Sequence, residues 1–201
     1  MRRVLPTIVE RTARGEITYD PYSRLLNDRI VVLAAPVDDT SAADIAAQLL
    51  WLDYDNPDRE ISLYINSPGG SVTAMLALYD TMQSLHAEIT TYCLGQAGSA
   101  AALLLAAGTP GRRSALPHAR VVLYQPGQDT ITGSASDLEI QSRELLRSRD
   151  VIEALFAEHT GRDLAAIGAD LNRQTVLTAA DAVAYGLVDT IVQTRRRGAA
   201  A

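Results

Sequence analysis

The sequence predicts an α/β fold built on a mostly parallel sheet, and two patterns carry that prediction. Short β-branched runs alternate with longer segments whose apolar residues recur at three- and four-residue spacing, which is typical of βαβ units. Glycine-rich turns follow two of these runs, at 66–70 and 95–98. Loops at the carboxyl ends of parallel strands carry the site in such sheets. The chain has 201 residues, 47% of them hydrophobic, which is enough for one domain with a single core.

The elements are expected in a regular order after an irregular arm that ends near Thr18. The alternating segments are strand 30–33, a helix capped by Thr40 or Ser41, strand 61–65, helix 72–85, strand 88–94, helix 99–107 and strand 120–124. In the first of these helices Ile45, Leu49 and Leu52 share one face. The segment 178–192 is expected to close the domain as a short helix and an edge strand.

A long helix is predicted over 136–159 and differs from the others in its charge. Leu138, Leu145, Ile152 and Phe156 share one apolar face, and Gly161 supplies a stop. The remaining surface carries many acidic and arginine side chains. This helix can cover the core, or it can project and contact another subunit, and the pattern alone leaves both open.

Composition excludes several functional classes. A net charge of −6 argues against nucleic-acid binding, and Arg195–Arg197 are expected to be a solvated tail. The longest apolar run, 100–107, is far below the roughly 20 residues that span a bilayer. Cys93 is the only cysteine and lies in an apolar run, which predicts a buried thiol and a reducing compartment. We therefore expect a cytoplasmic protein without a metal or cofactor.

Ser99 is the candidate nucleophile because it follows a strand and opens a helix, where the helix dipole favours a developing anion. Taken alone, Ser99 fits better as an N-cap or a small packing residue than as a nucleophile. Two glycine-containing turns at neighbouring strand ends strengthen the catalytic interpretation. Together they could direct the amides of Gly70 and Ala100 at one oxygen, as an oxyanion hole does.

Several strings of this sequence resemble ClpP, the proteolytic subunit of the Clp protease. They are SRLLNDRIVVL, ISLYINSPGGSVTA, LYDTMQ, GQAGSAAALLLAAG, QP at 125–126, SDLEI, HTG and DAVAYGLVD, in order from about Pro6 to Val192. The resemblance implies a ClpP/crotonase-like head of βαβ units with a projecting handle helix. It also implies two stacked heptameric rings, fed with polypeptide substrates by an ATP-driven AAA+ unfoldase. The implied divisions of the single domain are an axial arm (1–18), the head (19–126), a glycine-rich loop with the handle (127–160), and the head completion with the tail (161–201).

Carried over by position, the resemblance places Ser99 at the nucleophile and Gly70 and Ala100 at the oxyanion donors. The position of the histidine base holds Tyr124, and the position of the aspartate holds Gln174. No lysine exists in the chain to replace the base. The three histidines, His86, His118 and His159, are interpreted as surface residues away from the site. Because a tyrosine with an ordinary pKa near 10 stays protonated at neutral pH, we expect this subunit alone to be nearly inactive.

Two further surfaces depart from the family pattern. The positions that match the family's ATPase-docking pocket are Ser62, Tyr64, Ser84, Tyr92, Leu94, Ser114 and Leu116. Serines at three of them predict weak or altered docking of the unfoldase, because large apolar anchors dominate such contacts. The inter-ring pair is Asn172 and Arg173, so Arg173 lacks an acidic partner in its own chain at that site.

Three hypotheses remain. The leading one is a catalytically impaired ClpP-like subunit that serves as a structural or regulatory partner of an active paralogue in a mixed barrel, with the unfoldase docking through the paralogue. The second is an active ATP-dependent serine endopeptidase with a non-standard base. The third is a crotonase-like acyl-CoA enzyme, which would need a catalytic carboxylate and a coenzyme A pocket.

Overall fold

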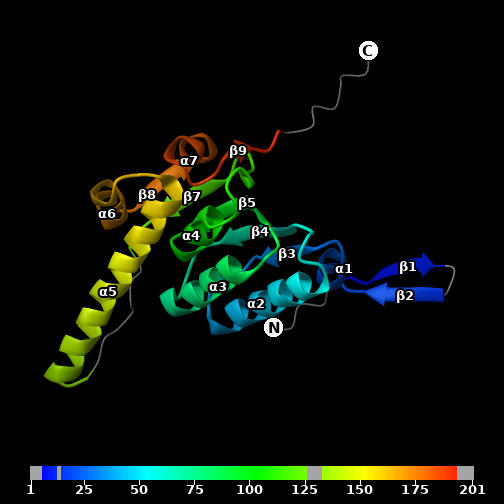
Figure 1. Ribbon diagram of the computed structural model, residues 1–201, viewed down its shortest axis with the longest axis horizontal. Coiled ribbons are helices and arrows are strands. Elements are labelled where there is room, and N and C mark those ends of the chain that lie inside the picture. The colour runs from blue at the N-terminus through cyan, green and yellow to red at the C-terminus, as the bar shows by residue number, and fades with distance from the viewer. Residues whose placement is uncertain (1–5, 13–14, 126–132, 194–201) are drawn as a thin grey trace, which may run out of the picture.

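A seven-stranded sheet forms the framework of the computed structural model, which describes residues 6–12, 15–125 and 133–193 (Figure 1). Its strands are β3 (Ile30–Leu33), β4 (Ile61–Ser67), β5 (Ile89–Gly98), β6 (Arg113–Ala115), β7 (Arg120–Leu123), β8 (Thr175–Thr178) and β9 (Thr190–Ile191). Neighbouring strands follow the order β3-β4-β5-β6-β9, and β7 pairs with both β5 and β8. Every pairing is parallel except β7 with β8. The α/β prediction is confirmed.

Helices α2 (Asp39–Asp55), α3 (Val72–Ser84) and α4 (Ala100–Ala106) cover one face of this sheet (Figure 1). The other described helices are α1 (Pro21–Asn27), α5 (Ala135–Thr160), α6 (Leu164–Asn172) and α7 (Ala179–Tyr185). Figure 1 shows α2, α3 and α4 side by side against the central strands. Alternate strand residues such as Val31 and Leu63 are fully buried, while Val32 and Tyr64 between them are only half-buried. One sheet face therefore builds the core, and the other stays partly open.

The long helix α5 projects from the body of the molecule (Figure 1). Ser134 caps its first turn in a reciprocal capping box with Asp137, and Gly161 ends it in the left-handed region at φ 68°. Ile152 and Phe156 near its C-terminal end are buried, whereas Ile140 near its other end is 63% exposed. The apolar stripe therefore joins the core only over its last turns, which selects the projecting alternative.

Several expected elements were wrong in detail. The irregular arm contains a hairpin of β1 (Ile8–Thr12) and β2 (Gly15–Tyr19), because its β-branched residues favour extended backbone. Asp38, not Thr40 or Ser41, caps α2, and Ser41 completes the capping box from the third position. The segment 95–98 continues β5 rather than turning, since Gln96 to Gly98 pair with β7. Strands β6 and β8 and helix α6 were not expected. Parts of the expected arm, most of the glycine-rich loop and the arginine tail lie outside the described residues.

Arg113 joins three parts of the fold that are distant in sequence. Its side chain pairs with Asp189, with the shortest contact at 2.6 Å. Its Nη1 atom also donates to the carbonyls of Ala106 at the end of α4 and His159 at the end of α5. The Arg113 hydrogen bonds lower the pKa of Asp189. This one side chain, 10% exposed, anchors the base of the projecting helix to the core.

We expect Arg113→Gln to lower the free energy of unfolding by about 3 kcal/mol at pH 7, as breaking a buried ion pair does. Since the pKa of Asp189 is depressed in the folded state, this contribution is present at neutral pH. It is lost as pH falls below about 4 through the folded-state pKa, so the difference between wild type and variant should shrink there. Urea unfolding across pH measures it. The matched control is Arg112→Gln, whose ion pairs are exposed and contribute about 1 kcal/mol or less. Equal losses in both variants would contradict this role.

Candidate active site

Ser99 stands between β5 and α4 in a strained turn. Its backbone angles are φ 41° and ψ −107°, close to the first central position of a type II′ turn, where glycine is usual. The Ser99 N–H donates to the Val122 carbonyl at 2.8 Å, which ties the turn to β7. The residue is 7% exposed, and its hydroxyl makes no capping bond to α4. Among the described residues the hydroxyl has no hydrogen-bond partner, so nothing there is placed to take its proton.

The two glycine-rich segments meet backbone to backbone beside Ser99. A Cβ atom at Gly98 would collide with the Pro68 carbonyl, and a Cβ atom at Gly69 would collide with the Gly98 carbonyl. Gly70, at φ 155°, lies against Val37 in an isolated parallel bridge that a side chain would also obstruct. Both segments therefore need glycine because the chains approach more closely than any side chain allows.

The amides expected to hold an oxyanion are unused in this arrangement. The bridge to Val37 uses the Gly69 carbonyl and the Ser71 N–H, and it leaves the Gly70 N–H out. The Ala100 N–H opens α4, where the first amides have no intrahelical partner. Neither amide has a hydrogen-bond partner among the described residues. Two unpaired donors in adjoining turns are what stabilisation of an oxyanion requires.

Tyr124 and Gln174 lie in one cavity of about 300 Å³. They come together because β7 and β8 pair antiparallel, with Leu123 opposite Thr175 at the end of the ladder. The Tyr124 hydroxyl donates to the Pro68 carbonyl at 2.8 Å, so its proton is directed at the glycine turn. The residues that line the cavity are Pro68, Gln96, Gly98, Arg120, Val122, Tyr124, Gln174 and Val176. No carboxylate is among them.

A separate depression borders Ser99 and contains no room for a water molecule. Its walls are apolar, and they come from three helices. The lining residues are Val72, Met75, Ser99, Ala100, Leu103 and Ile152. Ile152 belongs to α5, so the base of the projecting helix closes this side of the serine turn.

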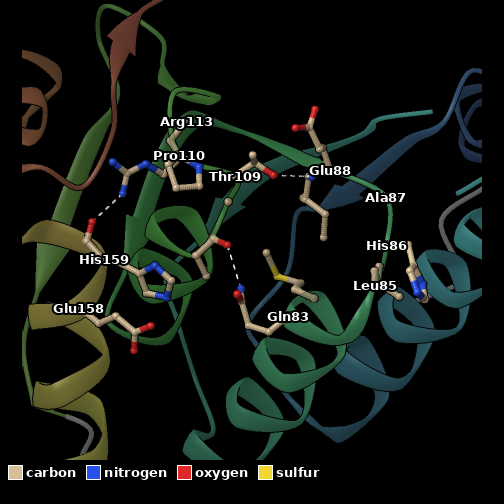
Figure 2. A pocket seen from close by; sticks show the side chains of 14 residues that line it. Gln83, Leu85, His86, Ala87, Glu88, Thr109, Pro110, Arg113, Glu158 and His159 are labelled. Atoms are coloured by element: carbon tan, nitrogen blue, oxygen red, sulfur yellow. Dashed lines mark hydrogen bonds between the residues drawn. The ribbon is translucent and has the colours of Figure 1, made fainter. Parts of the chain in front are cut away.

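The described histidines lie away from the cavity that holds Tyr124. His159 pairs through Nε2 with the Tyr79 hydroxyl at 2.9 Å, and burial lowers its pKa. Figure 2 shows it with Glu158 at the end of α5, facing Gln83 across a different cavity of about 460 Å³. The His86 side chain is 85% exposed beside Asp53, and His118 is exposed. Within the described part of the chain, no group of three or more His, Cys, Asp or Glu side chains could hold a metal.

Comparison with known proteins decides the family. The profile described as Clp protease matches residues 13–195. A putative ATP-dependent Clp protease proteolytic subunit-like protein of Streptomyces coelicolor is 56% identical over 196 residues, covering 97% of this chain and 93% of the relative. ATP-dependent Clp protease proteolytic subunit 4 of Streptomyces avermitilis is 53% identical, covering 97% and 86%. Subunit 3 of Frankia casuarinae is also 53% identical, covering 97% and 91%. The chain belongs to the Clp protease family.

In this Clp family chain, an apolar cavity of about 630 Å³ lies on the open face of the sheet. It includes two of the seven expected docking positions, Tyr64 and Leu94, and Tyr64 stacks on Tyr92 at 4.6 Å between ring centroids. The other lining residues are Pro6, Pro21, Tyr22, Leu25, Ile30 and Val32. Sequence reasoning missed these six. Strand alternation could have found Val32, because it pairs with Tyr64 on the same face.

The remaining expected docking positions are not part of this cavity. The Ser84 hydroxyl donates to the Thr81 carbonyl, and the buried Ser114 hydroxyl shares a hydrogen bond with Thr190 at 3.0 Å. Ser62 and Leu116 are half-buried on the sheet and at its edge. Two of the serine hydroxyls are therefore satisfied within the chain.

The two residues expected to form an inter-ring contact, Asn172 and Arg173, stand at the end of α6. Asn172 accepts a hydrogen bond from Gln125 at 2.6 Å. Arg173 is exposed, and no ion pair joins it to another described residue. In the described part of the Clp chain, no helix is both long and apolar enough to cross a membrane.

The strained turn at Ser99 predicts which of two variants, with glycine or with alanine at this position, is the more stable. Ala is ordinarily more stable than Gly in regular structure by roughly 0.5–1 kcal/mol. At Ser99 the positive φ reverses this order, so we expect Ser99→Gly to be more stable than Ser99→Ala by about 1 kcal/mol. Urea unfolding of both variants checks it. A more stable Ser99→Ala would mean that the turn is not strained in solution.

Proposed function

We propose that this chain is a catalytically impaired ClpP-type subunit. The observation that carries the proposal is the pairing at the base position, where the Tyr124 hydroxyl donates to the Pro68 carbonyl. A phenol that holds its own proton in this hydrogen bond lacks the basic ring nitrogen with which a histidine would take the Ser99 proton. Loss of the nucleophile or its base in a well-studied serine protease costs on the order of a million-fold in turnover.

We further propose that the subunit works in a mixed barrel beside an active paralogue. The projecting helix α5 and the glycine-built turns are kept, although two triad positions are not. Exposed apolar side chains support assembly, among them Ile140 and Leu146 on α5 and Trp51 on α2. In this arrangement the subunit supplies ring closure and chamber wall, with its arm at residues 1–18 near the axis. An acidic side chain from the other subunit type would form the ion pair that Arg173 lacks within the described part of its own chain.

Docking of an AAA+ unfoldase is assigned chiefly to the paralogue. The apolar cavity with Tyr64 and Leu94 is suited to bind an apolar loop of the unfoldase. However, Ser84 and Ser114 stand where the family has large apolar anchors, and central anchors dominate such contacts. We therefore expect docking through this subunit to be weaker than docking through a homologue that keeps those anchors.

The alternative of an active endopeptidase with a non-standard base has one observation in its favour. Ser99 keeps the strained turn and the unpaired amides of Gly70 and Ala100 beside it. Such a turn is maintained at a cost of about 1–3 kcal/mol. The acyl-CoA alternative lacks support for its catalytic carboxylate, since no acidic residue from the described part of the chain lines the cavity at Tyr124.

Restoring the triad tests the impairment. The double variant Tyr124→His/Gln174→Asp should gain peptidase activity of at least about 100-fold over wild type, the lower range for a placed general base. The measurement is fluorogenic peptide cleavage by assemblies formed with a homologous subunit whose nucleophile is replaced by alanine. Adding Ser99→Ala should remove the gain. Wild-type activity equal to that of the double variant would contradict the proposal.

Native mass spectrometry tests the mixed barrel. The purified chain is measured alone and after co-expression with a homologous subunit that has a complete triad. We expect mixed rings, and we expect Arg173→Ala to shift the population from double toward single rings. A chain that forms only homomeric double rings, and excludes the homologue, would contradict the partnership.

A further inference from the structure

The cavity that holds Tyr124 extends along β7 to a cation. Arg120, Val122 and Tyr124 alternate along the strand, so their side chains share one face, and all three line the cavity. Four residues of extended chain separate Arg120 from Tyr124, or about 13 Å. The cavity therefore runs as a groove with the inherited catalytic positions at one end and a guanidinium at the other.

Arg120 is a cation without a carboxylate partner in the described part of the chain. Its one hydrogen bond runs from Nη2 to the Gln96 Oε1 atom at 3.0 Å. The pairing of β5 with β7 sets that contact, because Gln96 stands directly opposite Arg120. By contrast, many arginines of this chain pair with carboxylates, among them Arg11, Arg24, Arg29, Arg112, Arg113, Arg143, Arg147 and Arg149. In a protein of net charge −6, an unpaired arginine in a groove is a feature to explain.

The middle of the groove fits an extended backbone. Gly98 contributes no side chain, while Val122 and the 57% exposed Val176 give apolar walls. The strand β8 on its far side pairs only with β7 among the described residues, so its outer edge offers unpaired N–H and C=O groups. An extended peptide can add to such an edge, with alternate side chains directed into the groove.

We propose that this groove binds an extended polypeptide segment that carries a carboxylate, and that Arg120 recognises the carboxylate. The polypeptide class rests on the proposed function, whereas the preference for an acidic group rests on Arg120 and Gln96. Gln96 accepts a hydrogen bond from Nη2 of the guanidinium and leaves its other N–H donors to a fork-like pair with a carboxylate. The chain thus holds peptides of selected charge at a site where it does not cut them.

The test measures binding rather than cleavage, on full-length protein carrying Ser99→Ala. The probes are fluorescein-labelled peptides of about ten residues, built from alanine, serine and threonine with amidated ends, long enough to exceed the groove. One glutamate is moved through every position, and a matching set carries glutamine. Fluorescence anisotropy should show at least one position where glutamate binds about fivefold more tightly than glutamine, the upper range for an exposed ion pair.

Variants locate the effect at Arg120. Arg120→Gln should remove the glutamate preference, and Arg120→Lys should keep part of it, because lysine keeps the charge without the bidentate fork. The matched control is Arg59→Gln, which removes an exposed charge outside the groove and should leave the preference unchanged. Higher salt should reduce the preference in wild type.

Three results would overturn the proposal: no binding of any peptide, an unchanged preference in Arg120→Gln, or a change in native mass of Arg120→Gln that accompanies its loss of preference. The last would assign Arg120 to a subunit contact. Because Ser99 is already alanine in this test, a finding that the wild-type chain cleaves peptides would defeat the proposed impairment alone. The Arg120 measurement would still stand or fall by itself.

Discussion

The close approach of the Pro68 carbonyl to Gly98 is the constraint on which the site depends. Strands β4 and β5 run parallel, and their register shifts between Ile65 and Ser67, which lets the two backbones converge. Glycines at 69 and 98 make the approach possible. Once it is made, Ser99 must leave β5 at a positive φ, and the Gly70 and Ala100 amides come into adjoining turns. The Tyr124 hydroxyl then donates a hydrogen bond to the same Pro68 carbonyl, which ties the end of β7 to the glycine turn.

Under the proposed impairment, this geometry explains how the form of a hydrolase site is kept without its chemistry. The serine turn and the positions of the two amides are set by backbone contacts among glycines, so they do not depend on the identity of residues 124 and 174. A tyrosine at the base position even adds a hydrogen bond to the turn. The projecting helix is joined to the same region, since Ile152 closes the depression at Ser99 and Arg113 holds the last turn of α5. The base of the projecting helix and the serine turn are therefore physically connected.

Much of this architecture could be predicted from the sequence because local patterns decide it. Apolar periodicity located α2, α3 and α5, and β-branched runs located β3, β4 and β7. The meeting of the segments 66–70 and 95–98 followed from parallel topology. The extension of β5 through Gly98 could not be foreseen, because glycine pairs usually end strands and only the contact with β7 stabilises this one. Strands β6 and β8 are short, and tertiary partners rather than propensity define them.

The least predictable features were contacts between side chain and distant backbone. Nothing in the local sequence of Tyr124 indicates that its hydroxyl bonds to Pro68, or that Arg113 bonds to the ends of two helices. The apolar cavity with Tyr64 and Leu94 was found only in part, since Tyr22 and Leu25 reach it from α1, a helix that the sequence did not single out. Family positions identified individual residues there, but packing determined which of them share a surface.

The most direct measurement of the central claim is labelling of Ser99 by a serine-reactive fluorophosphonate. The wild-type chain is tested alone and within an assembly with an active homologous subunit, which serves as the positive control, and Ser99→Ala gives the background. The account predicts that the homologue is labelled while this chain remains at background in both settings. Stoichiometric labelling of Ser99 in the wild-type chain would contradict the account.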